Sequence, residues 1–174
     1  VMIDTTLMVD VSDWDKILKK PTSFTNSKYI FTYFLGGMSD EVKQLLKITA
    51  AENHLEIIDV MDQTNMNVFS SGPQEFLYMI NNAELIFTDS FHASVFSILF
   101  QRPFVVFDRE ESKGSMNSRI DTLLGKLDLS RKAHWSRLAN DLFEADYAHS
   151  FELLKYERKK TQQFLEQCFE ATAN

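Results

Sequence analysis

The chain has 174 residues, 44% of them hydrophobic and 25% charged, which is typical of one folded domain with a sizeable core. Its formal net charge of −7, without a long basic stripe, argues against nucleic-acid binding, and its single cysteine excludes an internal disulfide. No apolar run approaches the roughly 20 residues that span a bilayer, so we expect a cytoplasmic protein with at most peripheral contact to the inner face of the membrane.

The first predicted element is a short helix in "SDWDKIL", residues 12–18, with Ser12 as its N-cap. Four runs rich in β-branched and aromatic residues then predict strands over residues 28–36, 55–60, 84–89 and 103–108. Most of these runs are continuously apolar, which is typical of strands that are covered on both faces of a parallel sheet.

Helical patterns alternate with these strands. They cover residues 39–54 with Ser39 as N-cap, a segment that opens at Pro73, and the apolar stretch that follows Ser90. A polar loop over residues 109–117 precedes a further helix capped by Ser118. The order of elements predicts an α/β fold, a Rossmann-like three-layer α/β/α sandwich with a mainly parallel sheet.

A long helix is predicted from about residue 150 to residue 171. Its expected packing residues are Leu154, Phe164, Leu165, Cys168 and Phe169.

Ligands of such sheets bind beyond the carboxyl ends of the strands, so the candidate site lies in the loops after residues 35, 60, 88 and 108. Ser90, Phe91, His92 and Ala93 form the first turn of a predicted helix, where unpaired N–H groups and the helix dipole suit phosphate or carboxylate. His92 can add a donor or move a proton there. Alternatively, it is a core or capping histidine bonded to the backbone.

Two glycines and two arginines flank the same edge. Gly36 and Gly37 follow the first strand and permit either a close approach of backbone to ligand or a tight turn. Arg109 at the end of the fourth strand and Arg119 in the first turn of the next helix can bind phosphate or carboxylate. Each arginine is alternatively a surface residue paired with a local acid.

Asp59, Asp89 and Asp108 also lie at strand ends, as a magnesium or phospho-acceptor site requires, but the first strand supplies no acidic group. Asp89 is more simply a turn residue or a partner for a nearby donor. The chain lacks HExxH, CxxC and GxSxG and the glycine patterns of dinucleotide and P-loop sites, so we predict no metal site.

Residues 71–109, "SGPQEFLYMINNAELIFTDSFHASVFSILFQRPFVVFDR", and residues 117–132, "NSRIDTLLGKLDLSRK", resemble the C-terminal half of the polysaccharide pyruvyl transferase family. The most specific segments are Pro-x-Glu-Phe-Leu, Thr-Asp-Ser-Phe-His and Arg-Pro-Phe. Residues 4–18 resemble the family's connector, with Thr5 and Thr6 where the family usually has a proline after the aspartate. The resemblance covers roughly residues 4–131.

The resemblance implies the C-terminal half of a GT-B-like enzyme, with a connector over residues 1–27, a Rossmann-like domain over 28–149, a C-terminal helix over 150–174 and an N-terminal domain absent from this chain. It also implies transfer of pyruvate from phosphoenolpyruvate, as a ketal, to a sugar or lipid-linked oligosaccharide in bacterial cell-surface or exopolysaccharide biosynthesis. No metal or nucleotide cofactor is implied, and we expect the chain to be inactive alone.

By the same resemblance, His92 binds the donor phosphate or acts as a general acid, and Arg119 and Arg109 bind carboxylate or phosphate. Two alternatives are the donor-binding domain of a GT-B nucleotide-sugar glycosyltransferase and a non-catalytic binding module. Saturable binding of a nucleotide sugar would favour the first alternative, and a strand-end cleft that binds no anion would favour the second.

Overall fold

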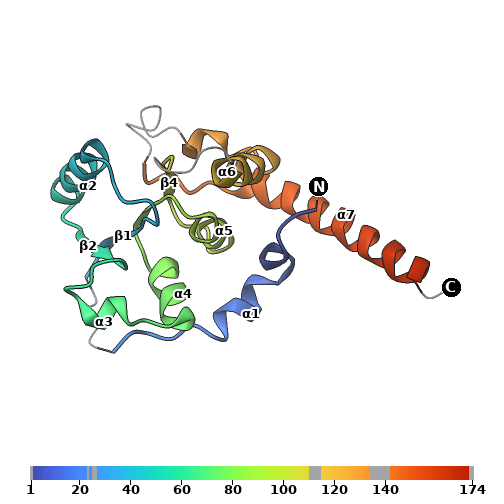
Figure 1. Cartoon of the computed structure of the whole chain (residues 1–174), viewed down its shortest axis with the longest axis horizontal. Coiled ribbons are helices and arrows are strands. Elements are labelled where there is room, and N and C mark those ends of the chain that lie inside the picture. The colour runs from blue at the N-terminus through green and yellow to red at the C-terminus, as the bar shows by residue number, and fades with distance from the viewer. Residues whose placement is uncertain (1, 23, 25–26, 110–114, 134–141, 173–174) are drawn as a thin grey trace.

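The computed structural model describes residues 2–22, 24, 27–109, 115–133 and 142–172. Within these residues, four parallel strands form one sheet in the order β2-β1-β3-β4 (Figure 1). The strands are β1 (Tyr29–Tyr33), β2 (Glu56–Asp59), β3 (Leu85–Thr88) and β4 (Phe104–Val106). Each lies inside its predicted run but is shorter than expected.

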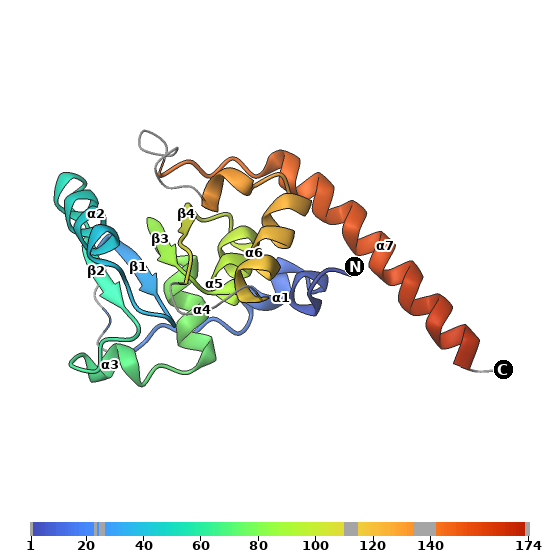
Figure 2. The same cartoon turned by 45° about the horizontal axis from the view of Figure 1, so that its top comes forward.

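Helices cover both faces of this sheet. Figure 1 shows α2 on one side and α4 and α5 on the other, and Figure 2 shows α6 beyond α5. The helical elements are η1 (Thr5–Met8), α1 (Val11–Asp15), α2 (Asp40–Glu52), α3 (Met66–Phe69), α4 (Pro73–Asn81), α5 (Phe91–Leu99), α6 (Ser115–Lys126), η2 (Ser130–Ala133) and α7 (Ala148–Thr172). The predicted Rossmann-like three-layer fold is confirmed.

The sheet separates two apolar clusters. Leu85 and Phe87 of β3 pack in the cluster that contains residues of α2, whereas Ile86 packs in the cluster of α4, α5 and α6. All three side chains are fully buried. Successive residues of a strand point to opposite faces, so a strand with helices on both sides is continuously apolar. This is why the apolar runs predicted the sheet correctly.

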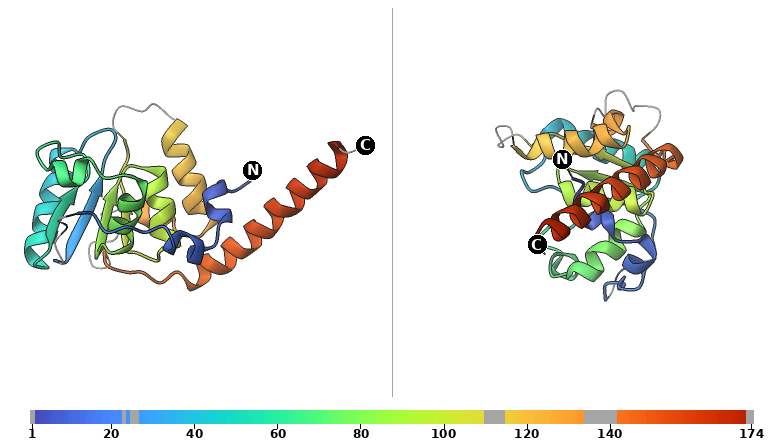
Figure 3. Two further views of the ribbon diagram at one scale, coloured as in Figure 1. Left: turned by 90° about the horizontal axis from the view of Figure 1, so that it is seen from below. Right: turned by 90° about the vertical axis from the view of Figure 1, so that its right-hand side faces the viewer.

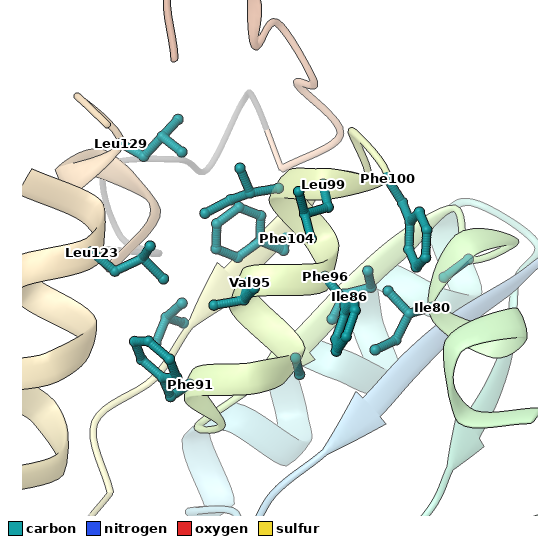
Figure 4. Packing of buried hydrophobic residues seen from close by; sticks show 14 of the residues in the cluster. Ile80, Ile86, Phe91, Val95, Phe96, Leu99, Phe100, Phe104, Leu123 and Leu129 are labelled. Carbon is teal, nitrogen blue, oxygen red and sulfur yellow. The ribbon is translucent and has the colours of Figure 1, made fainter. Parts of the chain in front are cut away.

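Helix α5 is enclosed nearly all round. Its side chains pack between the sheet, α4 and α6, as Figure 4 shows for Phe91, Val95, Phe96 and Leu99. Every residue of α5 is buried except His92. The structure therefore contradicts the interpretation of His92 as a core histidine.

The N-terminal segment and α7 are joined by hydrogen bonds. The Ile3 N–H donates to Oγ1 of Thr161 at 3.4 Å, and Arg158 donates to the carbonyl oxygens of Leu7 (2.6 Å) and Val9 (2.9 Å). These bonds satisfy backbone groups of η1 and its C-terminal neighbours, so they fix the segment against the first half of α7.

The second half of α7 extends away from the sheet (Figure 3). Leu154 is buried as predicted, but Phe164 and Phe169 are 50% and 71% exposed and Cys168 is also exposed. The prediction that these three residues pack inward is wrong for the described chain, because the helix continues past the elements that cover its first turns.

Two helix starts also differ from the predictions. Asp10, not Ser12, caps α1, because its carboxylate accepts the Ser12 N–H at 2.9 Å. Helix α6 begins at Ser115, so Ser118 lies inside the helix and residues 115–117 are not loop. The structure also contains a short helix, α3, that was not among the predicted helices. The predicted caps Ser39 and Ser90 are confirmed.

None of the described helices combines the length and the apolar character that crossing a membrane requires.

Candidate functional site

The strand order places a topological switch point at the carboxyl ends of β1 and β3. The chain leaves β1 toward β2 on one side, and β3 lies on the other side of β1. The connections that follow β1 and β3 therefore diverge, and ligands of open α/β sheets bind at such a switch point. The loop after β1 begins at Phe34, and the loop after β3 consists of Asp89 and Ser90.

Asp89 links the loops that follow β1, β3 and β4 at this switch point. Its Oδ1 accepts the Leu35 N–H at 2.8 Å, and its Oδ2 accepts the Gly36 N–H at 2.7 Å and Nε of Arg109 at 3.1 Å. A terminal nitrogen of Arg109 also donates to the Asp89 carbonyl oxygen at 3.4 Å. The side chain of Asp89 is 1% exposed and that of Arg109 is 16% exposed. We call Leu35, Gly36, Asp89 and Arg109 the Asp89 clamp.

The clamp changes the interpretation of three predicted site residues. The Gly36 N–H and the Nε of Arg109 are directed at Asp89. Gly37 has a φ of +81°, a conformation that favours glycine, so the tight-turn alternative accounts for this residue. Arg109 is paired with an acid, but this acid is Asp89, 20 residues earlier in the chain, and the arginine side chain is largely buried instead of lying at the surface.

Gly36→Ala should lower the free energy of unfolding by about 1–3 kcal/mol. A Cβ at this position would overlap Cγ of Arg109 and lie 3.2 Å from Oδ2 of Asp89, so the ion pair would have to shift. Urea denaturation followed by circular dichroism measures the change. The matched control is Gly125→Ala in α6, where no atom lies within 4 Å and stability should stay constant or rise by up to about 1 kcal/mol. Equal losses in both variants would contradict the steric explanation.

The turn that presents His92 is held by hydroxyl groups. Oγ1 of Thr88 donates to the Tyr33 carbonyl oxygen at 2.6 Å and accepts the Ser90 N–H at 3.0 Å. Ser90 then caps α5, because its hydroxyl accepts the Ala93 N–H at 3.4 Å. Ser90 and Ala93 are buried. The Ser90 N–H, the Ser90 hydroxyl and the Ala93 N–H all form hydrogen bonds within the turn. The first turn of α5 is thereby fixed to the end of β1.

Phe91 lies between two groups that can bind an anion. The His92 ring contacts it edge-on, with ring centroids 5.4 Å apart, and Cζ of Arg119 lies 4.2 Å from its centroid. Figure 4 shows Phe91 at the start of α5, on the side that faces α6. His92 is exposed and the side chain of Arg119 is 49% exposed. The structure therefore brings the two predicted residues to one aromatic ring.

The sequence analysis placed Arg119 in the first turn of its helix, but α6 begins four residues earlier, so Arg119 lies in the second turn. It also has an acidic neighbour that the sequence analysis missed, since its Nη2 lies 3.5 Å from Oδ2 of Asp4 in the N-terminal segment. The interpretation of Asp89 as a partner for a nearby donor is confirmed, but the sequence analysis did not identify Leu35, Gly36 and Arg109 as the donors. No cluster of His, Cys, Asp and Glu among the described residues could hold a metal ion.

Comparison with known proteins identifies the family of this chain. A family model described as polysaccharide pyruvyl transferase matches residues 1–111, which include all four described strands, the Asp89 clamp and the turn of His92. No curated protein and no solved structure matches the chain. The matched segment makes up more than half of the 174 residues. The chain therefore belongs to the polysaccharide pyruvyl transferase family.

Proposed function

We propose that this chain is the donor-binding half of an enzyme that transfers pyruvate from phosphoenolpyruvate to two hydroxyls of a sugar, as a ketal. The observation that carries the proposal is His92, the exposed residue of an otherwise buried helix, at the switch point of a sheet that matches the family model. The acceptor is a sugar or a lipid-linked oligosaccharide of bacterial cell-surface or exopolysaccharide biosynthesis.

The chemistry needs one proton donor and a site for a small polyanion. A protonated His92 donates its proton to C3 of the enol, which makes C2 electrophilic. One sugar hydroxyl attacks C2, phosphate leaves from the same carbon, and the second hydroxyl takes its place. Of the two protons that the hydroxyls lose, one restores the protonated His92 and the other is carried by the leaving phosphate. The products are a ketal and inorganic phosphate, so no redox step or metal ion is needed for the balance.

The described residues divide into ligands and supports. The Ser90 and Ala93 N–H groups are bonded within the turn, so the backbone N–H groups that the start of α5 offers to the donor are those of Phe91 and His92. Arg119 offers a guanidinium to the carboxylate or phosphate of the donor. Arg109 and Gly36 act through Asp89 by holding the loops in place. We further propose that acceptor contacts come from an N-terminal domain that this chain lacks, in a GT-B-like arrangement, and that the chain alone is inactive.

Binding to the 174-residue chain tests the donor assignment. In ¹H–¹⁵N spectra, phosphoenolpyruvate should shift the amide signals of residues 90–93 and the side-chain signal of Arg119, while pyruvate, which lacks the phosphate, should shift them little. Shifts caused by UDP-glucose and not by phosphoenolpyruvate would overturn the proposal in favour of a nucleotide-sugar glycosyltransferase. An absence of shifts with either compound would favour a non-catalytic module.

A further inference from the structure

A cleft of about 400 Å³ opens between the N-terminal segment and α6. Ile3 and Leu7 line it from the N-terminal segment, Leu123 and Leu127 line it from α6, and Phe91 of α5 also contributes to the lining. These segments are more than 100 residues apart in the chain, so the cleft is a product of the fold.

The lining of the cleft is mostly apolar. Ile3, Leu7, Leu123 and Leu127 contribute to it and are themselves largely buried. Phosphoenolpyruvate has a skeleton of three carbon atoms and carries two charged groups, so it has no hydrocarbon body to match such a lining. Sites of this size and composition bind organic molecules that have a substantial apolar body.

The charged side chains of the cleft favour an anion. Arg119 and Lys126 line it together with a single acid, Asp4, in a chain whose net charge is −7. Lys126 is paired with Glu157 of α7. Asp4 is only 3.5 Å from Arg119, and its other oxygen accepts the Thr6 N–H at 3.0 Å as the cap of η1. A guanidinium has five N–H donors, so Arg119 keeps donors for a ligand while it contacts Asp4.

We propose that this cleft binds an amphiphilic organic anion, with a carboxylate or phosphate head group at Arg119 and a hydrocarbon body along Leu7, Leu123 and Leu127. The site is adjacent to the donor site and shares Phe91 and Arg119 with it, but it does not depend on the proposed transfer reaction. A ligand there would contact both η1 and α6 and would hold the N-terminal segment against the domain.

Hexyl phosphate, inorganic phosphate and hexanol serve as probes for the 174-residue chain. Each buried methylene increases affinity about fourfold, so hexyl phosphate should bind at least about tenfold more tightly than inorganic phosphate. In ¹H–¹⁵N spectra it should shift signals of residues 3–7 and 122–127, and hexanol should do so only at much higher concentration. Equal affinity for hexyl phosphate and inorganic phosphate, or shifts confined to residues 90–93, would overturn the proposal.

Two variants distinguish binding of the phosphate head group at Arg119 from binding of the hydrocarbon body in the cleft. Arg119→Gln should weaken hexyl phosphate binding about tenfold and leave hexanol binding unchanged. Thr122→Trp places an indole in the cleft from an exposed position of α6 and should abolish binding of both, with folding checked by circular dichroism. His92→Ala should retain hexyl phosphate binding even if it removes the response to phosphoenolpyruvate, so the two proposals can fail separately.

The same ligand chemistry could come from a free amphiphile or from a lipid surface. Hexyl phosphate below its micellar concentration represents the first source, and vesicles of neutral lipid with and without an anionic lipid represent the second. The cleft assignment requires binding of the monomeric compound. Binding to anionic vesicles without any response to hexyl phosphate would overturn it in favour of a surface contact.

Discussion

His92→Ala, in the chain joined to the N-terminal domain proposed above, should lower kcat for the proposed pyruvyl transfer by about 10²- to 10⁴-fold, the range that a positioned general acid contributes. The variant should fold normally, because His92 is exposed and the fold derives no core packing from it. Release of inorganic phosphate from phosphoenolpyruvate, with the acceptor present, measures the effect.

The control for this substitution is His149→Ala. His149 is also exposed, and its ring lies 3.7 Å from Asp128, far along the chain from the strand ends, so its removal should leave kcat unchanged. A role in proton transfer predicts that the wild-type dependence of kcat on pH is lost in His92→Ala. A role in phosphate binding predicts a higher KM instead. Activity within a few-fold of wild type would remove His92 from the mechanism altogether.

The position of His92 was predictable because each step that leads to it is local. A continuous apolar run indicated β3, and a serine followed by a helical pattern indicated the cap of α5. The general rule for ligand sites in α/β sheets then placed this turn at the binding edge. What the sequence could not decide was whether His92 points inward. The structure shows that it does not: His92 is exposed, whereas all the remaining residues of α5 are buried against the sheet, α4 and α6.

The Asp89 clamp was not predictable by the same method. Its partners Leu35 and Gly36 lie more than 50 residues away in the chain, and they meet Asp89 only because β1 and β3 are neighbours in the sheet. Sequence patterns place Asp89, Gly36 and Arg109 at strand ends, but they do not give the order of strands. The sequence therefore predicted Arg109 as a ligand for the substrate, and its pairing with Asp89 became visible only in the structure.

The exposed end of α7 shows a different limit. Phe164 and Phe169 fit the helical spacing of a packed face, and the helix itself is present. Periodicity reports which side chains share a face, but it cannot report how far the covering elements extend. Leu154 is covered because the first turns of α7 lie against the domain, and the same face is exposed further along.

The largest effect on stability is expected at Asp89. Its carboxylate is almost fully buried and accepts two backbone N–H groups and an arginine. Removing the carboxylate leaves the Leu35 and Gly36 N–H groups without this acceptor and removes the ion pair with Arg109. Loss of one partner from a buried ion pair is costly because the other charge stays desolvated.

Asp89→Ala should therefore lower the free energy of unfolding by about 3–5 kcal/mol, measured by urea denaturation of the 174-residue chain at pH 7. The matched control is Asp108→Ala, because Asp108 follows the end of β4 but is exposed, and its loss should cost less than about 0.5 kcal/mol. Arg109→Ala added to Asp89→Ala should cost less than the sum of the single changes, since the two side chains are in direct contact. Comparable losses of unfolding free energy in the two aspartate variants, or full additivity with Arg109→Ala, would contradict a stabilising role of the Asp89 clamp.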